Sequence, residues 1–360
     1  MFRPPPRASG YLHTGYGEDL ALLQTRTERK SLAALVVLLA AFPFVASPFA
    51  LDLACQVFLA SIGALSLMLL TGYAGQISLG HAGLIAAGAF TTGILAREVS
   101  APFWITLPAS ALTGIVLGFV FGLPSLRLRG LYLAVSTLAL HFIVIYLGGE
   151  YETKRGFSTG IMVDPPRFAG FKLSDGRAWY FVLLVAAGLS LLVCINLLRS
   201  RSGRAWGAIH NRETVAEALG IDIARYKLLA FVISSSMTSV AGCLFAYYRG
   251  FVSIEAFDLF LSIQYVAMII IGGMGSLLGA LLGAAFVTVF PYLIEALLRL
   301  LPNIPRLAGD IFAVNYASFG VVMILFLIFE PLGLVGIWRR IQSYFLLWPF
   351  KYKPLAGTRK

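Results

Sequence analysis

The stretch RSRSGRAWGAIHNRETVAEALGIDIARYK, residues 199–227, is a long polar interruption between two of the many apolar runs of this chain. Inside it, Asn211 is a predicted N-cap, and Glu213 places a negative charge in the first turn, where the helix dipole favours one. Gly220 supplies the left-handed residue that ends many helices. These signals predict one short helix, Arg212 to Leu219, which is too small to fold alone and is suited to being held by a partner.

The composition of the whole chain is that of a membrane protein. It has 360 residues, of which 59% are hydrophobic and 12% are charged, whereas soluble domains carry about 25% charged residues. Its apolar runs reach the length of about 20 residues that crosses a bilayer as a helix. A membrane β-barrel would alternate polar and apolar residues, and this chain does not. The predicted fold class is therefore an all-α polytopic membrane protein.

About ten transmembrane helices are expected along the chain. Asp52 is expected at a tight turn between the first two, and glycines interrupt the third. The eighth is short for a full crossing, so whether it passes through the membrane stays open at this point. The expected spans cover residues 32–51, 53–71, 71–95, 103–123, 131–148, 178–198, 228–248, 261–271, 277–298 and 311–329.

The distribution of basic residues predicts the orientation of these spans. With the N-terminus inside, most Lys and Arg fall on inward-facing segments, as is typical of cytoplasmic loops. The tail 1–30, the loop 199–227 and the basic tail 339–360 are then cytoplasmic, the loop 149–177 faces the other side, and residues 31–338 form the transmembrane domain. The net charge of +11 follows from the same bias, so we expect membrane lipid as a partner and no nucleic acid.

Enzyme chemistry finds little support in the sequence. The chain has no GxxxxGK[ST] phosphate loop, no GxSxG nucleophile elbow and no His/Cys cluster with metal-ligand spacing, so no cofactor or metal is expected. Its three cysteines, Cys55, Cys194 and Cys243, show no paired spacing. An ion-coupled transporter usually keeps ionisable residues inside its spans, and these spans are nearly free of them. Transport by this chain therefore requires energy from elsewhere.

Two ladders of glycines four residues apart predict close helix packing. Each places a strip of small residues on one helix face, where another helix can approach closely. Packing is the plainer interpretation, and the lining of a pore is the alternative. The Gly-rich stretches 72–88 and 272–283 also resemble each other loosely, as in an internal repeat. The ladders are Gly114, Gly118 and Gly122, and Gly275, Gly279 and Gly283.

The glycine-broken segment TGYAGQISLGHAG, residues 71–83, is the candidate translocation path. Broken helices at membrane depth are tolerated where they are buried in protein or line a water-filled cavity, and their free backbone groups can then meet a polar substrate. A lone His in a bundle is more often a packing residue, which is the alternative for the histidine here. The polar side chains proposed to line the path are those of Tyr73, Gln76, Ser78 and His81.

Four motifs in order along residues 53–338 resemble the LivM family, the permease subunits of bacterial branched-chain amino acid ABC importers. They are TGYAGQISLGHAG (71–83), RLRGLYLAVSTLAL (127–140), GRAWGAIHNRETVAEALGIDIARYKLLAF (203–231) and IGGMGSLLGALLGA (271–284). The resemblance implies an ABC-importer permease fold in which Arg212 to Leu219 is the coupling helix that docks on an ATPase. Glu217, Ala218 and Gly220 match the family's EA…G core, although its longer form is absent. Arg212 and Glu213 complete the implied docking residues.

The resemblance also implies partners and cargo. These are a second homologous permease, two ATP-binding subunits that carry ATP and Mg, and a periplasmic substrate-binding protein that meets the loop 149–177 or the connection 250–260. The membrane would be the bacterial inner membrane, with both termini in the cytoplasm. The implied cargo is a branched-chain or related hydrophobic amino acid. A urea or amide importer is the near alternative, and an ion-coupled secondary transporter or a membrane enzyme is the alternative from another class.

Overall fold

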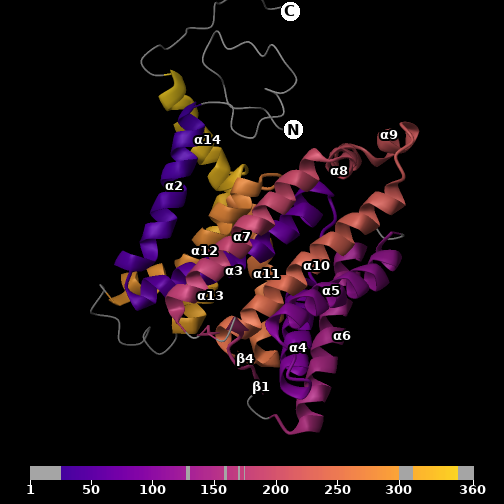
Figure 1. The fold of residues 1–360 in the computed structure, drawn as a ribbon. Coiled ribbons are helices and arrows are strands. Elements are labelled where there is room, and N and C mark those ends of the chain that lie inside the picture. Colours follow the sequence, from indigo (N-terminus) through magenta and orange to yellow (C-terminus); the bar gives the residue numbers. More distant parts are fainter. Residues whose placement is uncertain are drawn as a thin grey trace, which may run out of the picture.

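Helix α10 (Ile223–Arg249) runs through the middle of the bundle and packs against α5 (Phe103–Ser125), α4 (His81–Glu98) and α3 (Pro48–Leu67) (Figure 1). The computed structural model describes residues 26–126, 130–157, 160–168, 171–173, 175–299 and 311–347. The other elements are α2 (Arg26–Val45), η1 (Met68–Tyr73), α6 (Leu131–Arg155), β1 (Ile161–Met162), β2 (Arg167–Phe168), β3 (Phe171–Lys172), α7 (Gly176–Arg199), α8 (Arg201–Asn211), α9 (Glu213–Ala218), β4 (Phe251–Val252), η2 (Ile254–Phe257), α11 (Leu259–Gly272), α12 (Leu277–Arg299), α13 (Ile311–Phe329) and α14 (Gly333–Leu347).

The chain is an all-α polytopic membrane protein, as predicted. Within the described ranges, seven helices are long and apolar enough to span a bilayer, or eight if the pair 317–329 and 333–344, bent by 50°, makes one span. Of the ten expected spans, 311–329 enters only through this bent pair, and the spans 32–51 and 71–95 are not among the eight. Helix α2 begins with a run of charged residues, and α4 has only 18 residues, with Arg97 and Glu98 at its end. The eighth expected span reaches 19 residues because η2 precedes α11.

The boundary between the first two helices differs from the prediction at Asp52. That residue lies inside α3, and the chain breaks earlier, between Val45 and Pro48. Ser47 caps α3, since its Oγ accepts a hydrogen bond from the backbone N–H of Ala50 at 3.3 Å. Pro48 then occupies the first turn, where its missing N–H costs nothing. Ser47 and Pro48 therefore set the start of α3, and Asp52 does not interrupt the helix.

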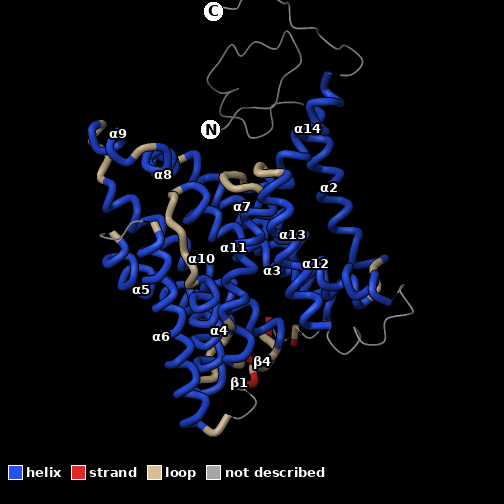
Figure 2. Tube along the Cα trace, turned by 180° about the vertical axis from the view of Figure 1, so that it is seen from behind, coloured by secondary structure: helices blue, strands red, loops and turns tan. Residues whose placement is uncertain are grey.

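The two ends of the bundle differ in character. Helices α8 and α9 lie at one end, together with the Arg26 end of α2 and α14, and we call this the α9 end (Figure 1). Strands β1 and β4 lie at the other, the strand end (Figures 1 and 2). There β1 pairs with β4 in antiparallel register, Ile161 opposite Val252, so the two loops expected outside the membrane are joined. A second pair, β2 with β3, sits within the longer loop.

The first glycine ladder lies against α10. A Cβ at Gly114 would come within 2.5 Å of the carbonyl oxygen of Ser235, and one at Gly118 within 2.9 Å of the Cβ of Ser235. At Gly122 the nearest atom would be a methyl carbon of Leu228, at 2.7 Å. Helices α5 and α10 therefore approach along three turns at a distance that no larger side chain permits.

The second ladder is only partly helical. Gly279 and Gly283 lie in α12 and face the backbone of α11, where a Cβ on Gly283 would come within 1.8 Å of the carbonyl oxygen of Met268. Gly275 does not belong to that strip, contrary to the prediction. It precedes α12 in a turn with a φ of +78°, a conformation that favours glycine.

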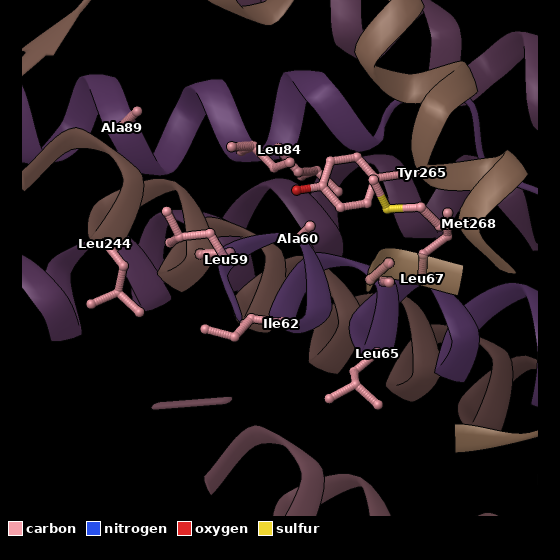
Figure 3. Close-up of a cluster of buried hydrophobic side chains, with 14 of the residues drawn as sticks. Leu59, Ala60, Ile62, Leu65, Leu67, Leu84, Ala89, Leu244, Tyr265 and Met268 are labelled. Carbon is pink, nitrogen blue, oxygen red and sulfur yellow. The ribbon is translucent and has the colours of Figure 1, made fainter. Parts of the chain in front are cut away.

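The core is continuous across the bundle and is densest around α3. Leu59, Ala60, Leu65 and Leu67 of α3 are buried in it. Figure 3 shows Tyr265 and Met268 of α11 beside this helix, with Leu84 of α4 close by. Helix α4 is short and follows a non-helical segment, and its packing in this apolar core explains how it is held inside the bundle.

Candidate functional site

The predicted break in the third span exists, and neighbouring helices accept backbone hydrogen bonds at its end and at the start of α4. Helix α3 continues into the π-helical turn η1, residues 74–80 carry no helix, and α4 starts at His81. Figure 2 shows this connection running back into the bundle beside α10. The N–H of Leu79 donates to Oγ1 of Thr137 in α6, and the N–H of Ala82 donates to Oγ of Ser262 in α11, both at 2.9 Å. The break is thus largely buried in protein, the condition for such backbone in a membrane, and its exposed residues are Gly75 and Ile77.

Three of the four side chains predicted for the translocation path carry buried polar atoms that have no hydrogen-bond partner among the described residues. These atoms are the hydroxyls of Tyr73 and Ser78 and Nε2 of His81. His81 is 1% exposed, and its ring lies 4.7 Å from that of Tyr265, centroid to centroid. Buried polar groups are usually paired, so unpaired ones clustered along one segment are a feature to be explained.

Gln76, the fourth predicted residue, is held firmly. It is 2% exposed, and its Nε2 donates to the backbone carbonyl of Lys227 at 3.0 Å. Its own backbone N–H donates to the carbonyl of Leu70, and its carbonyl accepts from Oγ1 of Thr71, both at 3.0 Å. One side chain therefore ties the break to the first turn of α10. The four residues share this segment, and none of them lines the three cavities found among the described residues.

The two glycine-rich breaks meet in space. The backbone N–H of Gly275 donates to the sulfur of Met68 in η1 at 3.3 Å. A Cβ on Gly72 would lie 2.4 Å from that sulfur and 3.1 Å from the nitrogen of Gly275. A side chain at Gly72 would press on Met68 and the backbone of Gly275, whereas Gly275 has room for a Cβ and is favoured there by its positive φ.

Helix α8 was missed by the sequence analysis, which expected a single helix in this loop. Trp206 and Ile209 are buried, and the indole N–H of Trp206 donates to the carbonyl of Tyr226 at 2.8 Å. The other end of α8 reaches the break, since a Cβ on Gly75 would come within 2.7 Å of Nδ1 of His210. The signal was available, because Gly203, Trp206 and Ile209 recur at helical spacing in a polar stretch.

Helix α9 covers Glu213–Ala218 and ends as predicted. Gly220 has a φ of +78°, and the N–H of Ile221 donates to the carbonyl of Ala216 at 3.1 Å, the closing bond of a Schellman motif. The predicted N-cap is wrong. Asn211 is the last residue of α8, where its side-chain amide donates to the carbonyl of Gly207 at 2.8 Å, and Arg212 takes the cap position with an extended backbone.

The surface of α9 is largely open. Val215 is 50% exposed and Leu219 is 74% exposed, while Ala216 alone is buried within this helix. Arg212, Glu217, Ala218 and Gly220 are all exposed. With the end of α8 these residues border an open groove of about 390 Å³, which is lined by Ala208, Asn211, Arg212, Val215, Ala216 and Leu219.

An ion pair anchors α9 to α10. Nζ of Lys227 contacts Oε1 of Glu213, and both side chains are largely shielded from solvent. The backbone carbonyl of the same lysine accepts the hydrogen bond from Gln76. Glu213, which was predicted as a docking residue, contacts Lys227 of its own chain. Lys227 was missed, since nothing in its sequence surroundings indicates a partner 14 residues earlier.

Over the described part of the chain, no group of three or more His, Cys, Asp or Glu side chains is placed to hold a metal ion. The three cysteines are buried and unpaired. The polar features of the molecule are therefore hydrogen-bonding groups along a buried break and an exposed short helix linked to it.

Comparisons with known proteins agree with this architecture. Residues 49–329 match the family described as branched-chain amino acid transport system / permease component. The high-affinity branched-chain amino acid transport system permease protein LivM of Salmonella typhimurium is 32% identical over 339 residues, which cover 88% of this chain and 76% of the relative. LivM of Escherichia coli is 33% identical with the same coverage.

A more distant relative is the autoinducer 2 import system permease protein LsrC of an Enterobacter species, 28% identical over 197 residues, which are 51% of this chain and 54% of that protein. No solved structure matches the chain. The family match covers most of the sequence, including the break, α8, α9 and α12. The chain therefore belongs to the family of permease components of branched-chain amino acid transport systems.

Proposed function

We propose that this chain is the transmembrane permease subunit of an ATP-driven importer that carries branched-chain or related hydrophobic amino acids across a bacterial inner membrane. Its partners are a second homologous permease, two ATP-binding subunits and a periplasmic substrate-binding protein. ATP and Mg bind to the partner subunits, and this chain performs no catalysis. The family membership and the transport functions of the LivM relatives support the assignment.

The observation that carries the proposal is a continuous series of contacts from α9 to the break. The exposed apolar side chains of Val215 and Leu219 offer a docking surface. Glu213 at the start of α9 holds Lys227, and the carbonyl of Lys227 holds Gln76. A partner that moves α9 therefore pulls on the first turn of α10 and on the break together. Because the span interiors are nearly free of ionisable residues, energy must come from the ATP-binding subunits, and these contacts transmit their motion to the break.

The break is suited to move because few bonds hold it from within. The backbone N–H groups of Ala74 and Gln76 donate to the carbonyls of Leu69 and Leu70, but no regular helix runs through residues 74–80, and the hydroxyls of Tyr73 and Ser78 have no described partner to lose. His210 of α8 lies against Gly75, so α8 contacts the same segment from the α9 end. Displacing the break changes which polar groups meet a passing substrate, and this is how the segment would contribute to alternating access.

The α9 end is proposed to face the cytoplasm. It holds the first turn of α2 and the last turn of α14, so these two helix ends lie on the same side as α9 (Figure 1). The basic residues of the loop 199–227 lie at this end, in agreement with the positive-inside rule. The joined strands β1 and β4 then face the periplasm and, with Glu255 and Asp258 nearby, offer a surface to the binding protein.

Co-expression with its partner subunits, purification in mild detergent and reconstitution into liposomes test the proposal. We expect two ATP-binding subunits and a second permease to co-purify, and L-leucine uptake to require ATP. Leu219→Asp should lose the ATP-binding subunits and uptake, since it puts a charge into the apolar groove. Thr214→Asp, also exposed on α9 but outside the groove, is the matched control and should retain both.

Uptake of L-leucine without ATP, driven by an ion gradient, would contradict the importer mechanism. Uptake of urea or short amides in place of L-leucine would keep the mechanism and overturn the substrate class. Normal co-purification and uptake by Leu219→Asp would remove α9 as the docking helix.

A further inference from the structure

A cavity of about 320 Å³ opens between α3, α10, α11 and α12 toward the strand end. Its position follows from its lining, since Arg249 is the last residue of α10 and β4 begins two residues later. The volume lies within the range of about 300–1,000 Å³ that is typical of small-molecule sites. The proposed translocation residues Tyr73, Gln76, Ser78 and His81 are not part of its wall.

One cation faces this cavity without an acid to neutralise it. Among the described residues, the guanidinium of Arg249 makes no ion pair, and its one recorded contact is with the ring of Phe245, 6.0 Å from the centroid. Arg155, another cation of the strand end, does have an acidic partner. It pairs with Glu98 at 2.6 Å and lies outside the cavity. A free guanidinium presents a planar fork of donors that matches a carboxylate.

Hydrogen-bond acceptors face it from α12 and α3. Pro291 lies inside α12 and has no N–H, so the carbonyl of Val287, which also lines the cavity, lacks its usual helical partner. Gln56 is oriented by donating to Oδ2 of Asp52 at 2.6 Å, and its Oε1 lies 3.5 Å from the hydroxyl of Tyr292. These oxygens suit an ammonium group, which needs up to three acceptors.

Most of the remaining wall is apolar, with Gln264 and Thr288 as its other polar residues. Leu59, Phe245 and Met268 contribute side chains, and Tyr265 is part of the same lining. Figure 3 shows Tyr265 and Met268 lying beside Ala60 of α3. The ring of Tyr265 also rests 4.7 Å from that of His81, the first residue of α4. One tyrosine therefore separates the cavity from the buried break.

We propose that this cavity is a binding site for a zwitterionic amino acid with an apolar side chain, in which Arg249 takes the carboxylate. The ammonium meets the carbonyl of Val287 and the oxygen atoms of Gln56 and Tyr292, and the side chain lies on the apolar wall. The cavity is then the position at which the cargo binds inside this subunit. This inference rests on the proposed function. It adds a selectivity for α-amino acids within the permease itself.

The test is equilibrium binding of radiolabelled L-leucine to the assembled permease–ATPase complex in lipid nanodiscs, without the substrate-binding protein. Leucinamide, which lacks the carboxylate, serves as competitor. The wild-type complex should bind L-leucine, and leucinamide should compete at least about tenfold more weakly, the range expected for one lost hydrogen-bonded charge contact. Arg249→Gln should weaken L-leucine binding by a similar factor and abolish the preference over leucinamide, while Arg249→Lys should recover part of it.

Arg155→Gln is the matched control, because it removes an exposed cation of the strand end outside the cavity. Since Arg249 is itself exposed, its variants should fold normally, which size-exclusion chromatography verifies. A second variant, Ala60→Leu, fills the cavity floor and should lower binding without changing any charge.

The outcomes separate this site from the proposed function. If the wild-type complex takes up L-leucine with ATP and the variants bind it unchanged, the cavity is not the site and the importer assignment stands. Equal competition by leucinamide in the wild type would also overturn the role of Arg249. If the complex transports no L-leucine at all, the proposed cargo fails and this site fails with it.

Discussion

Two short segments between long helices, the break at residues 74–80 and helix α9, are opposite in how they are held. The break is largely buried, with Gly75 and Ile77 exposed, and neighbouring helices accept hydrogen bonds from it through Thr137 and Lys227. Helix α9 is exposed on most of its surface, and the ion pair of Glu213 ties its first residue to α10. The break is held by its own chain, whereas α9 presents most of its surface to solvent. The comparison shows that a short segment between two helices can be packed inside the bundle or left open at its surface, according to what surrounds it.

The largest expected effect is on the packing of the break. A Cβ at Gly80 would lie 2.3 Å from the carbonyl oxygen of Thr137, so Gly80→Val should destabilise the fold by roughly 3 kcal/mol or more, at the upper end of overpacking costs. Fluorescence-detected size exclusion after heating should show loss of the monodisperse peak. Gly188→Val in α7, where a Cβ meets nothing within 4 Å, should behave like the wild type. A stable Gly80→Val protein would mean that the break is looser than its contacts indicate.

The next effect is functional and falls on α9. Glu217 is exposed, so Glu217→Arg should leave folding and insertion intact, with a stability change within about 0.5 kcal/mol. It should nevertheless abolish ATP-driven uptake, because it reverses the charge of the surface offered to the ATP-binding subunit. Uptake in proteoliposomes, together with size-exclusion profiles, checks both halves. Full transport by this variant would contradict the docking role of α9.

How far the sequence predicts these two segments differs for physical reasons. Span positions follow from apolar length, and the end of α9 follows from Gly220, because these depend on residues close in sequence. The cap at Ser47, the helix α8 and the N-cap of α9 were missed or misplaced, since several local signals compete there. The meeting of Gly72 with Gly275, the pairing of β1 with β4 and the bond between Gln76 and Lys227 could not be found, because they join residues far apart in the chain.

A smaller effect is expected when the link between the two segments is weakened. Lys227→Gln removes the charge that holds Glu213 and should lower ATP-driven uptake about tenfold with stability little changed. The exchange of Glu213→Lys with Lys227→Glu should restore most of the uptake, with a double-mutant coupling above about 1 kcal/mol, the upper end for exposed pairs. Lys154→Gln, which breaks the exposed pair with Glu150 at the strand end, is the matched control and should have little effect.

The control pair sharpens the comparison. If Lys154→Gln lowers uptake as much as Lys227→Gln does, loss of a lysine charge alone explains the result. If the exchanged pair transports no better than Lys227→Gln, the contact between α9 and α10 is not the route of coupling.

The smallest expected effect concerns the unpaired hydroxyls of the buried regions. Ser78→Ala should leave stability unchanged or slightly raised, since the hydroxyl makes no hydrogen bond among the described residues. Its effect on uptake should be a few-fold decrease if the break contacts substrate. Ser235→Ala removes another buried, unpartnered hydroxyl, one that faces α5, and should leave uptake unchanged. Thermal unfolding and uptake kinetics distinguish the two, and equal uptake by both variants would remove Ser78 from the path.

The most direct test of the link is to watch the break while ATP binds. Ile77 is 41% exposed, and the three native cysteines of this chain are buried, so Ile77→Cys gives this subunit a single accessible thiol. The account predicts that its labelling rate by a maleimide changes when ATP is added, and that Lys227→Gln abolishes this change while ATP binding persists. A labelling rate that ignores ATP, or that responds equally in Lys227→Gln, would contradict it.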